Sequence, residues 1–309
     1  MNTRISKSEF AGQRIWDRRR FLQTTGIAAL GALWGQTQAQ PFTSASADHG
    51  KIALQLYTVR NEFNKNIPDT LKKIRAIGFD TVETAFWPEH VTVKQAGQWL
   101  KEAGLTVCSA HVEIPVGDKK AAMLEVAEAY NCKRMIWHGW PEDKRYSSLD
   151  GTRELINIYN ESSHFAKSNG LMFGLHNHWW EYRNKVDGRF VYQVLLEGVE
   201  PDIFFEIDTY WVKVAGHDPA KIVGEFGKRA PLLHIKDGPA KWSDSLPADN
   251  PDPMVAVGKG TQNFPAIVKA AAGNTQFMVV EMDRVATDVF DAIRDSYNYL
   301  TQQGLATGK

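Results

Sequence analysis

Short runs of β-branched, aliphatic and aromatic residues alternate with longer segments of helical periodicity along most of the chain. Eight such runs lie at 51–58, 79–85, 105–113, 133–138, 171–178, 202–208, 231–236 and 276–282. Apolar residues recur at helical spacing at 69–74, ending at Gly78, and then roughly at 92–103, 118–130, 150–169, 188–197, 218–228, 263–273 and 285–302. Strand–helix alternation repeated eight times predicts parallel strands joined by right-handed crossovers.

The connection after the first strand distinguishes between an open sheet and a closed barrel. An open, doubly wound sheet normally carries a glycine-rich phosphate-binding loop at this point. Here the sequence is YTVRNE at 57–62, without a glycine. Eight strand–helix units in about 260 residues are also typical of a closed barrel. We therefore predict a single (β/α)8 barrel, a TIM barrel, over residues 51–305.

The first forty residues have the features of an export signal. The run RRRFL at 18–22 precedes a modest apolar stretch at 24–34, and TQA at 37–39 has the small-x-small pattern of a cleavage site. An amphipathic helix of the mature fold is the alternative, but Gly26, Gly31 and Gly35 weaken it. We predict a twin-arginine signal peptide over 1–39, a flexible lead-in over 40–50, and a periplasmic or otherwise exported protein handled by the twin-arginine machinery.

Charge and cysteine content exclude several classes of protein. The 309 residues contain 36 Lys and Arg against 36 Asp and Glu, so the formal net charge is zero, which disfavours a general nucleic-acid binder. No apolar run reaches the roughly 18 residues that span a bilayer. Two cysteines cannot build a disulfide scaffold or a cysteine-ligated zinc site. Export permits a disulfide between Cys108 and Cys132, but the pairing geometry is narrow and we expect buried thiols.

Titratable side chains stand at the end of every predicted strand from the second to the eighth. Residues two apart on a strand share a face, so the fifth to eighth strands each present a polar pair to the barrel mouth. Buried charges need partners or a metal, and imidazoles with carboxylates suit Mn²⁺, Zn²⁺, Co²⁺ or Mg²⁺. The residues are Glu83, His111, Glu113, His138, His176, His178, Glu181, Glu206, Asp208, His234, Lys236, Asp237, Glu281 and Asp283.

Tryptophans gather at the same strand ends and in the loops that follow them. Aromatic faces around a polar pocket suit stacking on a sugar ring, although tryptophans can also simply plug the top of a barrel. We expect the substrate to contact His111, His138, Trp140, Trp179 and Trp211.

Four segments resemble one known family. They are GLHNHWWE at 174–181, EIDTYW at 206–211, HIKDG at 234–238 and VGKG at 257–260. With these segments, essentially the whole mature chain resembles the sugar phosphate isomerase/epimerase family. These are the xylose isomerase-like TIM barrels, whose relatives include tagatose 3-epimerase, inosose dehydratase and endonuclease IV.

The resemblance implies one divalent ion held by His176, Asp208, His234 and Glu281. Many relatives have glutamate where His176 stands, so Glu181 is an alternative ligand from the fifth strand. Tagatose 3-epimerase-like enzymes have histidine where this chain has Trp211, which disfavours a simple free ketohexose epimerase.

The implied activity is that of a metal-dependent sugar isomerase or epimerase. It would remove a proton next to the carbonyl of a keto sugar through a metal-stabilised enediolate. Glu281 is the candidate ligand and base, and His178 or Glu181 the second acid/base. Lys236 is either a stabiliser or substrate anchor, or it forms a structural ion pair with Asp237.

Three other functions remain as alternatives. The first is a metal-dependent dehydratase or lyase acting on a keto sugar or 3-keto-glycoside. A non-catalytic sugar-binding protein would not need the ligand set, and an endonuclease IV-like nuclease would need a basic DNA track. The sequence leaves the sugar, the metal and any homo-oligomer open.

Overall fold

The computed structural model describes residues 49–244 and 252–308. The predicted export signal at 1–39 and most of the predicted lead-in at 40–50 lie outside the described residues. Of the helices in the described ranges, none is long and apolar enough to cross a bilayer.

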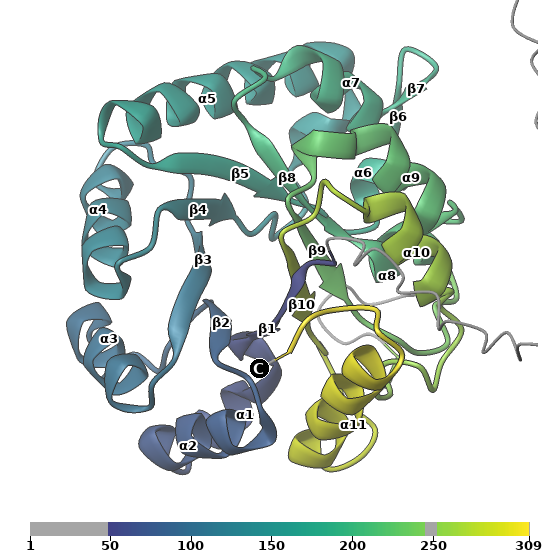
Figure 1. The fold of residues 1–309 in the computed structure, drawn as a ribbon. Helices are drawn as coiled ribbons and strands as arrows, with labels where there is room; N and C mark the ends of the chain where they lie inside the picture. Colours follow the sequence, from purple (N-terminus) through teal and green to yellow (C-terminus); the bar gives the residue numbers. More distant parts are fainter. Residues whose placement is uncertain (1–48, 245–251, 309) are drawn as a thin grey trace, which may run out of the picture. The chain divides into compact units, whose positions relative to one another are not determined.

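Eight parallel strands close into a barrel at the centre of the molecule (Figure 1). Their order around the barrel is β1-β10-β9-β8-β5-β4-β3-β2, as consecutive crossovers require. All eight predicted strands are found and the predicted TIM barrel is confirmed. The strands are β1 Lys51–Gln55, β2 Thr81–Thr84, β3 Thr106–Val112, β4 Arg134–Trp137, β5 Met172–His176, β8 Phe204–Asp208, β9 Leu232–Ile235 and β10 Phe277–Val280.

Helices surround the barrel and cover the outer faces of its strands (Figure 1). Short 3-10 turns lie at Leu56–Val59, Lys144–Ser147 and Gly227–Arg229. The α-helices are α1 Arg60–Phe63, α2 Ile67–Ile77, α3 Val93–Glu102, α4 Lys119–Tyr130, α5 Leu149–Ser168, α6 Trp180–Arg183, α7 Val191–Gly198, α8 Thr209–Val214, α9 Pro219–Phe226, α10 Phe264–Ala271 and α11 Val289–Gln302.

Helix α2 illustrates how local sequence defines these elements. The Asn66 side chain accepts a hydrogen bond from the Asp69 amide at 3.0 Å and caps the first turn. Leu71 and Ile74 are fully buried on the face that packs inward. The helix ends at Gly78, whose φ of 131° is open to glycine at little cost.

One predicted helix begins too early. The pattern predicted helix over 188–197, but a small hairpin of β6 Lys185–Val186 and β7 Arg189–Phe190 precedes α7. Asp187 and Gly188 form its turn, with φ of 50° and 74°. An Asp-Gly pair favours a two-residue turn with positive φ, and this local preference outweighs the helical periodicity.

The barrel interior is apolar at one end and polar at the other. Ala53, Cys108, Ile136, Phe204, Leu232 and Val279 form a separate buried apolar cluster. Gly174 makes room for the Phe204 ring, because a Cβ at Gly174 would lie 2.4 Å from it. Cys108 and Cys132 are both free and buried, as expected. Beyond the apolar cluster, the inward positions of the same strands are polar and form the candidate site.

Candidate active site

Strand register places the polar residues of β5, β8 and β9 beside one another. His176 on β5 is level with Glu206 on β8, and Asp208 is level with His234 on β9. Inward positions alternate along a strand, so Phe204, Glu206 and Asp208 face the interior at successive heights. Two overlapping groups of ligand-type side chains result, and they share His176 and His234.

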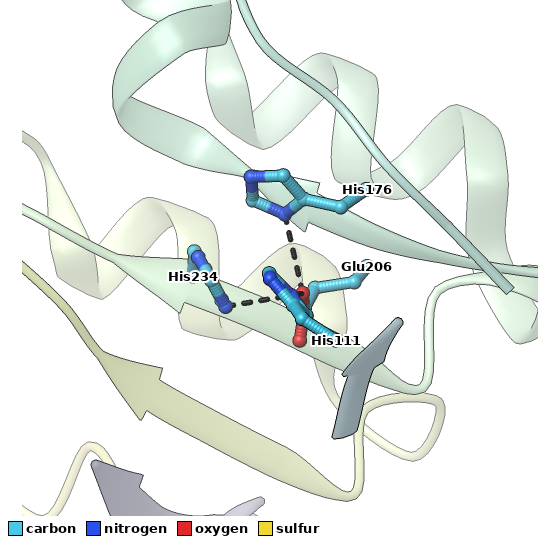
Figure 2. A group of neighbouring side chains, drawn as sticks. All are labelled: His111, His176, Glu206 and His234. Atoms are coloured by element: carbon cyan, nitrogen blue, oxygen red, sulfur yellow. Dashed lines mark hydrogen bonds and ion pairs between the residues drawn. The ribbon is translucent and has the colours of Figure 1, made fainter. Parts of the chain in front are cut away.

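The inner group consists of His111, His176, Glu206 and His234 (Figure 2). One carboxylate oxygen, Oε2 of Glu206, lies 2.8 Å from His111 Nε2, 3.2 Å from His176 Nδ1 and 3.1 Å from His234 Nε2. The Glu206 oxygen therefore stands between three imidazole nitrogens, in the position that a metal ion shared by them would need.

Glu83 on β2 supports the inner group from the other side of the barrel. Its buried carboxylate accepts hydrogen bonds from Gln55 Nε2 at 2.6 Å and from the Ser109 hydroxyl, and it lies 2.7 Å from His234 Nε2. Burial would raise the pKa of Glu83, but the charges of His111 and His234 hold it well below its usual range. Glu83 is therefore an ionised carboxylate that fixes the orientation of His234.

The remaining charges of the inner group follow from the two neighbouring carboxylates. Burial, followed by the charge of Glu83, raises the pKa of Glu206. Burial lowers the pKa of His111, but Glu83 and Glu206 raise it more, to about 9. The network thus holds imidazolium and carboxylate together in a buried layer.

The mouth group consists of His176, Asp208, His234 and Glu281, the four residues that the family resemblance implied as metal ligands. His234 Nδ1 lies 2.7 Å from Glu281 Oε2 and 4.0 Å from Asp208 Oδ2. His176 Nε2 lies 3.9 Å from the same Asp208 oxygen. The other Asp208 oxygen, Oδ1, caps α8 by accepting from the amides of Tyr210 and Trp211. Capping fixes the Asp208 side chain and leaves Oδ2 for the mouth.

These donors fit a divalent cation. Asp208 Oδ2 and His234 Nδ1 are buried without a hydrogen bond of suitable geometry. The second nitrogen of each imidazole faces a carboxylate, His176 Nδ1 at Glu206 and His234 Nε2 at Glu83 and Glu206. Metal-binding histidines are characteristically oriented by such carboxylates. The mouth group is thus able to hold an ion, with the inner group orienting its two histidines.

Lys236 already places a positive charge in the mouth group. Its buried Nζ lies 2.9 Å from Asp208 Oδ2, 2.7 Å from Glu281 Oε2 and 2.8 Å from Asp283 Oδ2. Burial lowers the pKa of Lys236, but the three carboxylates raise it more, to well above its usual range. An ion bound here would replace the contacts of Lys236 with Asp208 and Glu281. The contact of Lys236 with Asp283 would remain.

The two partners of Lys236 in the loop after β10, Glu281 and Asp283, have different pKa values. Burial opposes ionisation of Glu281, but Lys236 and then His234 keep its pKa well below the usual range. Burial raises the pKa of Asp283 to about 6, ahead of the opposing effect of Lys236. Glu281 is therefore ionised, and Asp283 titrates near neutral pH.

Asp237 does not pair with Lys236. Its carboxylate accepts hydrogen bonds from the amides of Gly238, Gly258, Gly260 and Gln262, at 2.9–3.1 Å. A Cβ at Gly260 would lie 2.1 Å from Asp237 Oδ1, so only glycine allows this approach. The VGKG segment and Asp237 thus fix a loop beside the site.

A central cavity of about 330 Å³ opens over the mouth group. His178 lines it with a buried Nδ1 that has no hydrogen-bond partner, and its ring stacks on Trp180 at 4.4 Å. Burial and Lys236 hold the pKa of His178 well below its usual range, so the ring is neutral. The lining residues are Tyr57, Ala85, Phe86, His111, His138, Trp140, His176, His178, Lys236, Glu281 and Asp283.

Gly139 allows the β4 loop to approach the histidines that follow β5. Its φ is 71°, and a Cβ there would lie 2.7 Å from the His176 carbonyl oxygen and 3.3 Å from His178 Nδ1. Close packing at Gly139 places His138 and Trp140 at the cavity wall opposite Glu281.

The residues predicted from sequence divide into three sets. His111, His138, Trp140, His176, His178, Lys236 and Glu281 line the central cavity, whereas Asp208 and His234 are fully buried beside it. Glu181, Trp179 and Trp211 do not line it. Trp179 packs on Trp242 at 4.7 Å, and the buried Trp211 ring lies 5.8 Å from Lys236 Nζ.

Glu181 lies behind His178, away from the mouth group. Its carboxylate accepts a hydrogen bond from the His178 amide at 3.0 Å and lines a small separate hollow with Tyr146, Tyr159 and Tyr182. Burial raises the pKa of Glu181 to about 8. Of the two candidates from β5, His176 is the one that lies beside Asp208.

Sequence reasoning assigned no role to several residues of the site. Tyr57 and Phe86 line the cavity from the β1 and β2 loops, and Asp283 reaches Lys236. The signal for Asp283, Glu83 and Glu206 was present, because each stands at a predicted strand end. For Tyr57 the only signal in the sequence was its position shortly after the first strand.

Comparison with known proteins agrees with this architecture. Residues 71–303 match the family described as the xylose isomerase-like TIM barrel. A sugar phosphate isomerase/epimerase from Parabacteroides distasonis superposes with a TM-score of 0.69 at 24% identity, covering 84% of this chain and 100% of that one. No curated protein sequence matches this chain.

Two more distant structures carry different activities on the same fold. An L-ribulose 3-epimerase has a TM-score of 0.58 at 16% identity, covering 83% of this chain and 94% of its own. A probable 3-DHS dehydratase from Bacillus anthracis has a TM-score of 0.63 at 15% identity, covering 81% and 98%. At these identities the likeness shows the fold, and activity has to be argued from the site.

Proposed function

The chain belongs to the xylose isomerase-like TIM barrel family, and we propose that it is a divalent-metal-dependent sugar isomerase or epimerase. The observation that carries this is the mouth group, in which the ligand-type atoms of buried Asp208, His234 and Glu281 converge beside His176. A divalent ion held by His176, Asp208, His234 and Glu281 would supply Lewis-acid polarisation of a substrate carbonyl.

Side chains of this protein are placed to move a proton next to that carbonyl. Glu281 is ionised and lines the cavity on the β10 side, whereas neutral His178 lines it on the β5 side with a free Nδ1. Glu281 is the base in this proposal, and His178 accepts or returns a proton on the other side. Two proton-transfer groups on different walls are what epimerisation or isomerisation needs.

Lys236 has the electrostatic role in the proposal. Removing a proton next to a carbonyl leaves negative charge on oxygen, and a preorganised ammonium in a buried site stabilises such charge. Lys236 lines the cavity and is held by Asp283 as well as by the mouth group. His111, His138 and Trp140 complete the wall that would bind the sugar.

A dehydratase or lyase is the second candidate. Elimination requires a proton donor for the leaving group at a distance from the base. His138 lines the cavity on the β4 side with its Nε2 3.3 Å from Glu113 Oε1, but burial lowers the pKa of His138 to about 4, so it would donate only after taking up a proton during the reaction. The same first step, proton removal next to the carbonyl, precedes both outcomes.

Hydrogen exchange with solvent tests the proposal. Metal-loaded protein is incubated in D₂O with a panel of 2-keto and 3-keto sugars, and deuterium is read at the carbon beside the carbonyl. We expect incorporation or intramolecular hydrogen transfer, lost in Glu281→Gln and retained in Glu197→Gln on the exposed end of α7. Exchange with an unsaturated or cleaved product selects the lyase. Turnover without any hydrogen transfer at that carbon rules out the mechanism.

We also propose that the precursor is exported by the twin-arginine route, on the basis of the RRRFL run at 18–22. Replacing Arg18 and Arg19 by lysine should retain the precursor in the cytoplasm, read by cell fractionation. An unchanged yield outside the cytoplasm would exclude this route.

A further inference from the structure

A second hollow lies beside the central cavity, between the β2–α3 loop and helix α4. It has a volume of about 250 Å³ and we call it the side groove. Phe86, Trp87, Ala122, Met123, Val126 and Tyr130 are among its lining residues. None of these six carries a formal charge, in contrast to the mouth group, whose members are imidazoles and carboxylates.

The side groove adjoins the central cavity. Ala85, Phe86 and His111 line both hollows. Phe86 is 54% exposed, and its ring stands edge-on to His138 at 5.1 Å, so a large apolar face stays open to solvent at the junction. A ligand whose polar part lies over the mouth group can therefore extend across the exposed Phe86 ring into the side groove.

The groove walls are fixed and largely apolar. Trp87 stacks on Phe63 at 4.9 Å, and its Nε1 donates a hydrogen bond to the Tyr130 hydroxyl at 2.9 Å. These two polar atoms satisfy one another, which leaves ring faces and aliphatic carbon as the binding surface. Glu89, Glu113 and Lys119 also line the groove and are exposed to solvent. This surface suits an uncharged ring and gives no cluster of cations for a phosphate.

We propose that the side groove binds an apolar, ring-containing aglycone of a substrate whose sugar lies in the central cavity. The inference rests on the proposed function and names its substrate class, a glycoside of a keto sugar. Burying one aromatic ring that would otherwise stay in water favours binding. The phenyl glycoside of a keto sugar should therefore bind about tenfold or more tightly than the methyl glycoside of the same sugar.

Two substitutions on the same turn of α4 test where the ring binds. Ala122 lines the side groove, whereas Ala121 is exposed and does not line it. Ala122→Trp should fill the groove, remove the preference for the phenyl glycoside and leave methyl glycoside affinity unchanged. Ala121→Trp should keep the preference. Affinities are measured by calorimetry on the metal-loaded full chain, and thermal unfolding checks that both variants fold.

The outcomes of these measurements distinguish failure of the aglycone assignment from failure of the proposed sugar-acting function. If the methyl glycoside binds but the phenyl glycoside has no advantage, the aglycone assignment is overturned and the sugar-acting function stands. A phenyl preference that survives in Ala122→Trp also overturns it. If neither glycoside binds and no keto sugar exchanges hydrogen with solvent, both proposals fail.

Discussion

The inner group and the mouth group have nearly the same composition but differ in what occupies their centres. Each is built from imidazoles and carboxylates, and His176 and His234 belong to both. In the inner group the centre is an oxygen of Glu206, within 3.2 Å of three imidazole nitrogens. In the mouth group the centre is approached by the ammonium of Lys236.

The difference teaches that ligand-type residues alone do not identify a metal centre. Glu206 is fully buried on strand β8, and its oxygen is one of the inner group's own ligand-type atoms. Lys236 reaches its position through a flexible side chain and has Asp283 as a third partner. In the proposed function the mouth group is therefore the metal centre, and the inner group is its support.

Removing a mouth-group ligand is expected to have the largest effect. Asp208→Asn should abolish stoichiometric binding of added Co²⁺ or Mn²⁺, because an amide oxygen lacks the charge that offsets ion desolvation. His234→Ala and Glu281→Gln should do the same. Calorimetry and metal analysis after gel filtration measure this, with unfolding curves to confirm the fold. Full occupancy in all three variants would refute the assignment.

Removing the resident cation should destabilise the metal-free protein. Lys236→Met leaves buried Asp208 and Glu281, and partly buried Asp283, without their ammonium, and breaking a buried ion pair costs about 3–5 kcal/mol. Co²⁺ should restore part of this stability, measured by urea unfolding with chelator or with metal. The control is Lys259→Met, which removes an exposed pair with Asp295 and should cost less than about 1 kcal/mol. Equal losses in the two variants would contradict the comparison.

Substitution in the supporting layer should weaken metal binding without abolishing it. Glu83→Gln removes the charge that faces His234 Nε2, so the ring is less firmly oriented for an ion at Nδ1. Loss of such a carboxylate typically costs about 10–100-fold in metal affinity or activity. Calorimetric titration of the variant against wild type measures it. An affinity loss as complete as that of Asp208→Asn would mean that the inner group itself holds the ion.

Glu181 is a buried acid that belongs to neither group and has no cation beside it in the described part of the chain. It therefore shows what burial alone does to a carboxyl group. Burial raises the pKa of Glu181 from 4.5 to about 8, so the folded chain retains a proton that unfolding releases. Stability should therefore fall as pH rises through this interval, by about 1 kcal/mol between pH 7 and 8. Glu181→Gln should remove this dependence, and exposed Glu197→Gln should not. Parallel urea unfolding across that range would show it, and identical slopes in all three proteins would contradict it.

The strands could be predicted because local sequence defines them. Each β-rich run is short, apolar and bounded by glycine or polar residues, and all eight became barrel strands. The predicted start of the helix at 188 was wrong. The Asp187-Gly188 turn involves only two residues, and a search for helical periodicity averages over a longer window. The turn signal was present in the sequence and was outweighed by the longer pattern.

Of the site, only the residues that stand at the ends of predicted strands could be identified from the sequence. That His176, Asp208, His234 and Glu281 approach one another follows from parallel strands meeting at one end of a barrel. The contact of Glu83 with Gln55, Ser109 and His234 depends on register between strands distant in sequence, which no local pattern contains. Side-chain direction likewise separates Trp140, which lines the cavity, from Trp211, which is buried.

Lys236 in the mouth group determines whether the protein can fold before it binds a metal ion. The buried carboxylates of Asp208 and Glu281 and the partly buried one of Asp283 would repel one another in a chain that folded without a counterion, and Lys236 supplies that counterion from within the sequence. Folding therefore does not have to wait for metal supply. A metal-free barrel can be completed first and take up an ion later, with the ion replacing one positive charge by another at an already assembled site.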